Sequence, residues 1–204
     1  MFVVVRHSNT FEAGEPPRRI GARTDLPLTA KGTEQARALG RHFADEGWRF
    51  TRVLASPLRR TRETAAGILA AQPDPAPAPQ DAEFLREIDH GPDENAREDA
   101  VLARIGQAAL AAWDDRAEPP PGWIVDAEAR LAAWRVLFAG MDAETGPVLL
   151  VTSNGAARFA LMADPALQRA AAALPSLKLA TGSYGVIARD RAGELAIHTW
   201  GAVP

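Results

Sequence analysis

Two short apolar runs constrain the fold of this chain more than any other feature of its sequence. Residues 2–5 are Phe-Val-Val-Val, and residues 147–152 are Pro-Val-Leu-Leu-Val-Thr. Neither run alternates with polar residues, and unbroken runs of this length are typical of strands buried on both faces. We therefore expect a central sheet that is covered by helices on both sides.

Helical patterns separate these two strands from several others. Residues 29–46 place Ala36, Leu39 and Phe43 at helical spacing, with Thr29 as the expected N-cap. Similar patterns predict strands over 52–55, 82–85, 183–189 and 194–200, and helices over 58–71, 95–116, 124–141, 154–163 and 165–174. Alternation of strands and helices predicts an α/β fold, here three-layer α/β/α with a mostly parallel central sheet.

The length of the chain favours a single domain over 1–204. Residues 11–28 contain several glycines and prolines without a periodic pattern, so we expect a long loop there. Two proline-rich segments, 72–80 and 118–122, are incompatible with helix and separate the helical patterns around them.

The composition excludes several classes of site. The chain has no cysteine, which excludes disulfides, iron–sulfur clusters, thiolate zinc sites and cysteine nucleophiles. Its four histidines are not grouped at metal-ligand spacing, so we expect neither a metal nor another cofactor. A net charge of −3 does not suggest a nucleic-acid partner.

The composition also indicates a compartment and a source. The apolar run 2–5 is too short for a signal peptide, and no apolar stretch approaches the roughly 18 residues that cross a membrane. We therefore expect a cytoplasmic protein with no membrane partner. Of the 23 lysines and arginines, only Lys31 and Lys178 are lysine. This bias is typical of a GC-rich, bacterial genome.

Three of the predicted strands end in polar residues that suit a phosphate ester. Residues 6–10 are Arg-His-Ser-Asn-Thr, residues 56–61 are Ser-Pro-Leu-Arg-Arg-Thr, and residues 152–155 are Thr-Ser-Asn-Gly. In parallel sheets, ligands bind beyond the carboxyl ends of the strands. Helix N-termini favour anions, and arginine binds phosphate oxygens through two N–H groups. The combination indicates a phosphate site that contains a histidine.

Each of these features, taken alone, also has a purely structural interpretation. The structural alternatives are a polar strand end for Arg6 and His7, a solvated helix face for Arg59, Arg60 and Arg62, a helix N-cap for Asn154, and a turn residue for Asp25. The order and spacing of the features, rather than any one of them, favour the chemical interpretation.

That order and spacing resemble the histidine phosphatase superfamily, which has the phosphoglycerate-mutase-like fold. The family begins with a strand that ends in Arg-His-Gly-Glu/Gln-Thr, to which residues 6–10 correspond. Its motif Thr-Asp-x-Pro-Leu-Thr-x-x-Gly-x-x-Gln-Ala matches residues 24–36 throughout. Ser-Pro-Leu-x-Arg-x-x-x-Thr-Ala matches residues 56–65, and Glu-Ile-x-x-Gly matches residues 87–91. The resemblance extends from the first strand to the strand that ends at Thr152.

The resemblance implies a two-step phosphoryl transfer on a small phosphorylated substrate. His7 matches the family's nucleophile, which becomes a phosphohistidine. Glu87 matches the carboxylic acid that protonates the leaving alkoxide and then deprotonates water. Asp89, Asp93 and Glu94 are alternatives for that carboxylic acid.

The matching motifs also imply which residues bind the substrate or inorganic phosphate. Arg6 and Arg60 match the arginines that hold the phosphoryl oxygens. The full expected set is Arg6, His7, Ser8, Asn9, Arg60, Asn154 and Gly155.

The chain departs from the family pattern at three site positions. The family's second histidine lies in a Ser/Thr-His-Gly turn after the later strand, and Asn154 stands in its place here. An amide donates a neutral hydrogen bond where an imidazolium donates a charge-assisted one, so we expect phosphate binding to persist and turnover to be attenuated. Ser8 and Asn9 replace a glycine and a Glu or Gln. His90 is a candidate for a compensating histidine.

Three functions are compatible with these residues. The first is a phosphoric-monoester hydrolase, and the second is a phosphate-binding or regulatory protein without turnover. A phosphoryl mutase is the least favoured, because it needs a closed basic cap. The helical cap insertion, expected at about 73–146, carries many acidic residues instead.

The substrate and the oligomeric state do not follow from the sequence. Specificity is expected from the cap helices, about 95–141, and from the loop 11–24. The loop carries three arginines that suit solvent exposure better than a second anion, namely Arg18, Arg19 and Arg23. The cap carries three tryptophans that suit either the core or a homodimer interface, namely Trp113, Trp123 and Trp134.

Overall fold

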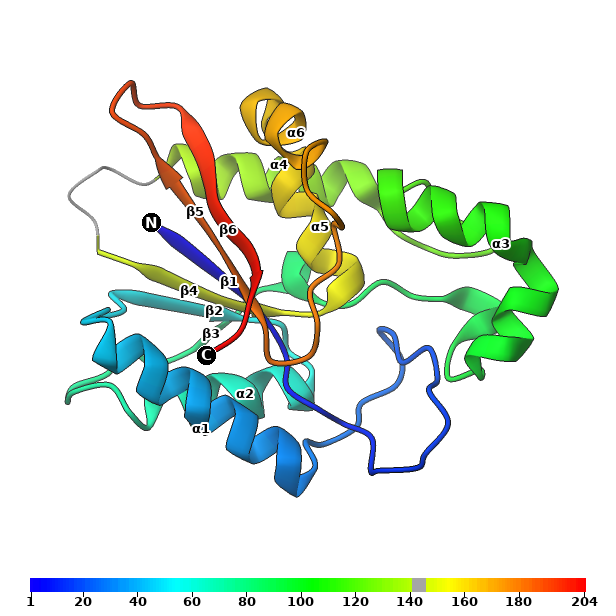
Figure 1. The fold of residues 1–204 in the computed structure, drawn as a ribbon, viewed down its shortest axis with the longest axis horizontal. Coiled ribbons are helices and arrows are strands. Elements are labelled where there is room, and N and C mark those ends of the chain that lie inside the picture. The colour runs from blue at the N-terminus through cyan, green and yellow to red at the C-terminus, as the bar shows by residue number, and fades with distance from the viewer. Residues whose placement is uncertain (141–145) are drawn as a thin grey trace.

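A six-stranded mixed sheet forms the centre of the described chain (Figure 1). The computed structural model describes residues 1–140 and 146–204. The strands pair in the order β3-β2-β4-β1-β5-β6. The first four are parallel to one another, and β5 pairs antiparallel with both β1 and β6. Their bounds are Phe2–Arg6 (β1), Arg52–Ala55 (β2), Gln80–Asp81 (β3), Val148–Thr152 (β4), Tyr184–Arg189 (β5) and Leu195–Ala202 (β6).

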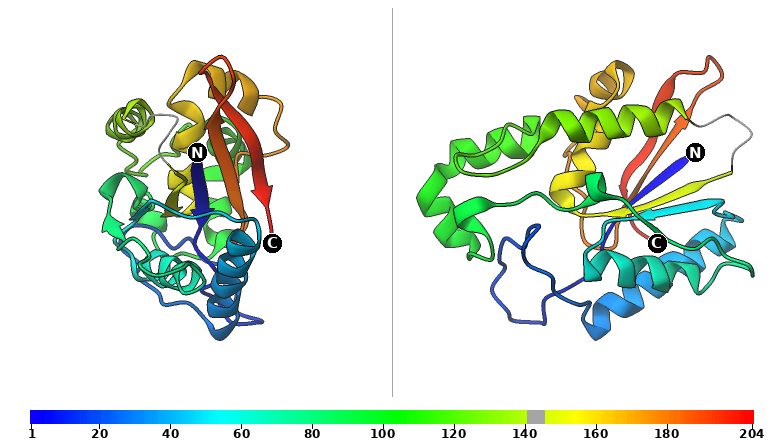
Figure 2. Two further views of the ribbon diagram at one scale, coloured as in Figure 1. Left: turned by 90° about the vertical axis from the view of Figure 1, so that its left-hand side faces the viewer. Right: turned by 180° about the vertical axis from the view of Figure 1, so that it is seen from behind.

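Helices cover both faces of this sheet, as Figure 2 shows, which confirms the three-layer prediction. Helices α1 and α2 lie on one face and α4, α5 and α6 on the other, while α3 extends beyond the carboxyl ends of the parallel strands (Figure 1). Their bounds are Ala30–Asp45 (α1), Arg59–Leu69 (α2), Glu98–Arg116 (α3), Ala127–Ala139 (α4), Asn154–Met162 (α5) and Pro165–Ala171 (α6). Among the described residues, no helix combines the length and the apolar character needed to cross a membrane.

The apolar runs that predict buried strands supply both halves of the core. Val3 and Val5 of β1 pack in a cluster that includes Phe43 of α1. Val4 faces the other way, into the cluster that includes Phe159 of α5. Because successive side chains of a strand point to opposite faces, an unbroken apolar run serves two helical layers at once.

The segment 82–85 is not a strand, contrary to the sequence-based expectation. The sheet pairing ends when the Ala82 N–H donates to the Ala55 carbonyl at 2.9 Å. The chain then turns into a short 3₁₀ helix, η1 (Glu83–Leu85), which buries Leu85 completely. The strand β3 lies just before it, in the end of the proline-rich segment.

The two helices of the expected cap start later than predicted, at Glu98 and Ala127. Before each helix the backbone adopts a positive φ, 61° at Asn95 and 47° at Asp126, so the helix cannot extend backwards. Helix α3 also bends at Gly106, where φ is 80° and ψ is 160°. A glycine suits this bend because it adopts positive φ without steric cost. The predicted end at 141 lies outside the described residues.

The three tryptophans of this region belong to the core. Trp113, Trp123 and Trp134 are buried in the cluster that α3, α4 and α5 share. The alternative of a tryptophan-lined interface is therefore wrong for these side chains.

Candidate active site

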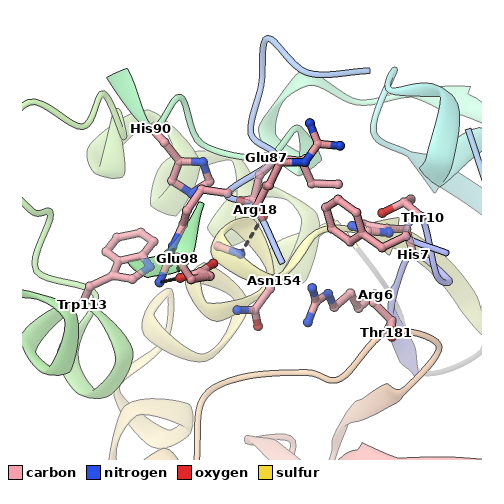
Figure 3. A pocket seen from close by; sticks show the side chains of 14 residues that line it. Arg6, His7, Thr10, Arg18, Glu87, His90, Glu98, Trp113, Asn154 and Thr181 are labelled. Atoms are coloured by element: carbon pink, nitrogen blue, oxygen red, sulfur yellow. Dashed lines mark hydrogen bonds and ion pairs between the residues drawn. The ribbon is translucent and has the colours of Figure 1, made fainter. Parts of the chain in front are cut away.

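The polar strand ends meet at one edge of the sheet, where β1, β4 and β2 end side by side. The N–H of His7 donates to the Thr152 carbonyl at 2.9 Å, just past the paired residues Arg6 and Thr152. A cavity of about 130 Å³ opens at this edge. Figure 3 shows Arg6, His7, Glu87 and Asn154 around it, so the structure brings these four predicted site residues together.

His7 presents a neutral imidazole to this cavity. Only 3% of the residue is exposed, and its Nδ1 lies 2.8 Å from the Ser8 carbonyl oxygen. Since a carbonyl only accepts, Nδ1 carries the proton and Nε2 keeps its lone pair. Burial, followed by the positive charges of Arg60 and Arg6, holds the pKa of His7 well below its usual value, against the raising effect of the Ser8 bond. The ring is therefore neutral at neutral pH, with an Nε2 lone pair that can act as a nucleophile.

A single residue, Leu179, orients both Arg6 and Asn154. Arg6 Nη1 donates to the Leu179 carbonyl at 2.7 Å, and the Leu179 N–H donates to Asn154 Oδ1 at 3.0 Å. The N–H requires an acceptor, so the amide oxygen of Asn154 must face it. Asn154 Nδ2 makes no hydrogen bond to the described residues, so it can donate to a ligand.

Glu87 is fixed beside them by two backbone donors. The Ile88 N–H donates to Oε1 at 2.9 Å, and the Gly155 N–H donates to Oε2 at 3.0 Å. The Glu87 residue is 5% exposed. Its negative charge opposes the lowering of the pKa values of Arg6 and Arg60 by burial. The carboxyl group is thus held at the start of α5 and within a positively charged environment.

Gly155 leaves the space that Glu87 occupies, which yields a first prediction. A Cβ atom at this position would overlap Glu87 Oε1 and would lie 3.1 Å from Cδ. We expect Gly155→Ala to displace the carboxyl and to lower kcat for alkyl phosphates by about tenfold or more. Steady-state kinetics measure this, with Gly140→Ala as the control, since its Cβ would meet nothing nearer than 3.3 Å. Equal kinetics for both variants would contradict the placement of Glu87.

Arg60 is fully buried but does not line the cavity. Its Nη1 donates to the Thr24 carbonyl at 2.6 Å and its Nη2 to the Gly21 carbonyl at 3.1 Å. Its Nε has no partner among the described residues. Arg60 therefore ties the long loop to α2 and adds positive charge near His7. The neighbouring Arg59 and Arg62 are exposed, as a solvated helix face predicts.

Ser8 and Asn9 also lie outside the lining of the cavity. The Ser8 N–H donates to Thr64 Oγ1 at 3.0 Å, while its own hydroxyl is buried without a partner among the described residues. Asn9 Nδ2 donates to the Phe11 carbonyl at 2.5 Å and to Thr29 Oγ1 at 3.2 Å. The Asn9 amide is therefore engaged in holding the loop.

The alternative carboxylates have structural partners. Asp89 pairs with Arg23 at 3.1 Å, and Asp93 pairs with Arg104. Neither Asp89 nor Asp93 lines the cavity. Within residues 1–140 and 146–204, no three histidine, aspartate or glutamate side chains are grouped so as to hold a metal ion.

Glu94 holds the same two residues of the long loop that Arg60 contacts, Gly21 and Thr24. Its Oε1 accepts from the Gly21 N–H at 2.9 Å and from Thr24 Oγ1 at 2.6 Å, and its Oε2 accepts from the His90 N–H at 3.2 Å. Burial disfavours the carboxylate, but the His90 side chain, the Thr24 hydroxyl and the two N–H groups outweigh it and lower the pKa of Glu94 to about 2.

The acid sensitivity of the fold yields a second prediction. The pKa of Glu94 falls from 4.5 to about 2 on folding, so its stabilising effect is complete above pH 4.5 and is lost as the pH falls towards 2. We expect Glu94→Gln to be less stable than the wild type at pH 7, with a difference that shrinks between these two pH values. Urea unfolding at stepped pH measures it, and the exposed Glu128→Gln is the control. A constant difference across the range would contradict this assignment.

Several residues line the cavity that the sequence did not assign to it. Arg18 and Arg19 lie there rather than in open solvent, together with Glu98 and Trp113 of α3 and with Thr181. They meet because the loop pairs with the chain before α3, where the Arg19 N–H donates to the Ala96 carbonyl at 2.9 Å. No local sequence pattern signals this pairing.

The turn after β4 places Ser153 and Asn154 differently. Arg6 pairs with Thr152, so His7 and Ser153 are the next residues along these two neighbouring strands. Ser153 is the N-cap of α5, and its hydroxyl is buried without a partner among the described residues. Asn154 is the first residue of the helix and lines the cavity. The interpretation of Asn154 as a mere N-cap is therefore wrong.

Comparisons with known proteins agree with this geometry. The model of the histidine phosphatase superfamily (branch 1) matches residues 2–202. A 2,3-bisphosphoglycerate-dependent phosphoglycerate mutase of Methylobacterium sp. (strain 4-46) is 34% identical over 143 residues, 68% of this chain and 68% of that protein. The corresponding mutase of Rhizobium etli is 28% identical over 75% of this chain and 74% of that protein.

A solved structure shares the fold over the whole chain. The mycobacterial glucosyl-3-phosphoglycerate phosphatase superposes with a TM-score of 0.75 and 20% identity, over 100% of this chain and 99% of that one. The same mycobacterial phosphatase has been solved with inorganic phosphate and with VO3.

Proposed function

Because this chain belongs to the histidine phosphatase superfamily, we propose that it is a phosphoric-monoester hydrolase acting through a phosphohistidine at His7. One observation carries this proposal. The buried His7 is neutral, its Nδ1 proton is fixed on the Ser8 carbonyl, and it shares a cavity with Arg6 and Glu87. The substrate is a small phosphorylated molecule, which the volume of about 130 Å³ supports.

The first step transfers the phosphoryl group to His7. The Nε2 lone pair attacks phosphorus, an N–P bond forms, and the bond from phosphorus to the leaving oxygen breaks. Arg6 and the Asn154 amide donate to the phosphoryl oxygens as negative charge accumulates on them. This step requires Glu87 in its protonated form, which gives the carboxyl proton to the leaving alkoxide, and the alkoxide departs as an alcohol.

The second step returns the enzyme to its starting state. The Glu87 carboxylate takes a proton from water, whose oxygen attacks phosphorus. The N–P bond breaks, inorganic phosphate forms, and Nε2 of His7 regains its lone pair. Arg60 supports both steps through its positive charge near His7.

Trapping of the covalent intermediate tests this mechanism. The wild-type chain is mixed with p-nitrophenyl phosphate, quenched at high pH, and analysed by peptide mass spectrometry. We expect an acid-labile phosphoryl group on the peptide that contains His7. Turnover without that adduct, together with full activity of His7→Ala, would overturn the mechanism.

A second candidate function is favoured by the residue at the start of α5. Asn154 gives only a neutral hydrogen bond, and Asn9 is engaged elsewhere, so the chain is alternatively a phosphate-binding or regulatory protein without turnover. Binding of inorganic phosphate without any phosphomonoester hydrolysis would favour this function.

Histidine replacements at the turn after β4 distinguish an enzyme that has lost catalytic activity from one whose residues suit a specific reaction. Asn154→His alters the residue that the motif aligns with the family's second histidine, and Ser153→His alters the residue that follows β4 beside His7. A gain in kcat of about tenfold or more in either variant indicates an attenuated enzyme. A loss in both indicates that the present residues suit a specific reaction.

We further propose that α3, within the expected insertion of residues 73–146, acts as a cap over the substrate. The position of α3 beyond the carboxyl ends of the strands supports this role (Figure 1). The curated relatives are named as mutases, so mutase activity is a less favoured alternative. It is tested by incubating the chain with 2,3-bisphosphoglycerate and 3-phosphoglycerate and following the appearance of 2-phosphoglycerate.

A further inference from the structure

We propose that the end of the cavity remote from His7 is a subsite for hydroxyl groups of the leaving group, formed by His90, Glu98 and Trp113. This proposal rests on the proposed hydrolase function. In Figure 3, His7 and Arg6 lie at one side of the cavity, and His90, Glu98 and Trp113 lie at the other. A phosphoryl group held at His7 therefore directs its ester oxygen and leaving group towards these three side chains.

Glu98 supplies a hydrogen-bond acceptor. Arg19 contacts only one of its oxygens, with Nε 3.0 Å and Nη2 2.8 Å from Oε2. The other oxygen, Oε1, accepts no hydrogen bond from the described residues. A carboxylate oxygen in this state accepts well from a hydroxyl group and repels another carboxylate or phosphate.

His90 supplies a second polar group. It is 5% exposed, and its ring packs edge-on against Trp123 with centroids 4.6 Å apart. Its Nδ1 faces Glu94 Oε2 at 3.7 Å. This Nδ1 is buried and makes no hydrogen bond to the described residues. No hydrogen bond joins Nε2 to the described residues either, and His90 lines the cavity, which leaves Nε2 for a ligand hydroxyl.

Trp113 forms a rigid wall of this subsite. Arg158 holds it in two ways: its guanidinium carbon lies 4.2 Å from the indole centroid, and its Nη1 donates to the Trp113 carbonyl. Trp113 is 1% exposed although it lines the cavity. An indole beside polar groups suits the C–H faces of a hydroxylated carbon chain.

The existing contacts of Arg18 and Arg19 favour hydroxyl groups over a second anion in this subsite. Arg19 is paired with Glu98, and Arg18 donates to Asn95 Oδ1 at 2.8 Å while lying over the Phe11 ring at 5.5 Å. An anionic leaving group would approach the unbonded oxygen of Glu98, and the repulsion between the two negative charges would weaken its binding. A hydroxyl group meets donors and acceptors without that cost.

Three phosphomonoesters of equal chain length test the subsite. Propyl phosphate has no hydroxyl group, glycerol 3-phosphate has two, and 3-phosphoglycerate has one hydroxyl and one carboxylate. We expect the kcat/KM of the wild type for glycerol 3-phosphate to exceed that for each of the other two by about tenfold. A preference for propyl phosphate or for 3-phosphoglycerate would overturn the proposal.

Variants assign the preference to these residues. In Glu98→Ala we expect the ratio of kcat/KM for glycerol 3-phosphate over 3-phosphoglycerate to fall at least about fivefold, since both the acceptor and the repulsion are lost. His90→Gln is expected to lower kcat/KM for glycerol 3-phosphate but not for propyl phosphate. Asp99→Asn is the matched control, because Asp99 is the next residue along α3, is exposed and pairs with Arg97. A ratio that Glu98→Ala leaves unchanged would overturn the assignment.

A fourth substrate separates failure of the subsite from failure of the hydrolase function. The p-nitrophenyl ester reports the phosphoryl chemistry at His7 without a hydroxylated leaving group. If it is hydrolysed but the three-carbon esters are indistinguishable, the subsite is wrong and the hydrolase stands. If no ester is hydrolysed and His7 acquires no phosphoryl group, the hydrolase function itself is wrong.

Discussion

Replacement of His7 by glutamine is expected to lower phosphomonoester turnover by roughly 10³-fold or more, because it removes the nucleophile of the first step. Glutamine is polar and similar in length, but its amide nitrogen has no available lone pair. The variant still carries Arg6 and the Asn154 amide, so inorganic phosphate is expected to bind. Steady-state kinetics with p-nitrophenyl phosphate and calorimetric titration with phosphate measure the two effects separately.

His42, in helix α1, provides the control for this variant. His42 Nε2 contacts the Tyr184 hydroxyl at 2.7 Å, away from the cavity. We expect His42→Gln to retain the activity and the phosphoryl adduct. If His7→Gln turned over at the wild-type rate, the nucleophile would have to be another residue, and the two-step mechanism would fail with it.

The gathering of Arg6, His7 and Asn154 at one cavity could be predicted because strand ends obey simple rules. Unbroken apolar runs predicted β1 and β4, and the carboxyl ends of parallel strands meet at one edge. Arg6, His7 and Asn154 follow directly from that rule, since each lies within two residues of a predicted strand end. Glu87 followed from its motif alone, because the segment before it forms a 3₁₀ turn rather than the expected strand.

Contacts between distant segments could not be predicted in this way. Arg60 was expected on the phosphoryl group, yet two of its nitrogens hold carbonyl groups of the loop. The position of Glu98 and Trp113 in the cavity depends on the pairing of the loop with the residues before α3. Such pairing is set by backbone hydrogen bonds between segments some 80 residues apart, for example between Arg19 and Ala96. Local periodicity carries no signal for it.

Glu87→Gln is expected to have the second largest effect, and its size should depend on the leaving group. An amide cannot donate an acidic proton, so we expect kcat for glycerol 3-phosphate to fall by roughly 10²–10⁴-fold. The p-nitrophenolate ion leaves without protonation, so formation of the phosphohistidine from p-nitrophenyl phosphate should fall far less. Hydrolysis of that intermediate still needs a base, and we therefore expect an initial burst of p-nitrophenol followed by slow turnover. Stopped-flow absorbance measures both phases.

Structural damage predicts a different pattern from loss of the proton donor. The glutamine amide would turn an N–H group towards the N–H of either Ile88 or Gly155, which costs about 1–3 kcal/mol of stability. Thermal unfolding identifies that cost, and Glu83→Gln is the control because Glu83 is exposed and pairs with Arg86. Unfolding alone would reduce the burst amplitude and would lower the turnover rate of every substrate by the same factor. A proton donor at Glu87 instead requires a full burst with a good leaving group and a large loss with an alkyl one, because only the alkoxide depends on the carboxyl proton.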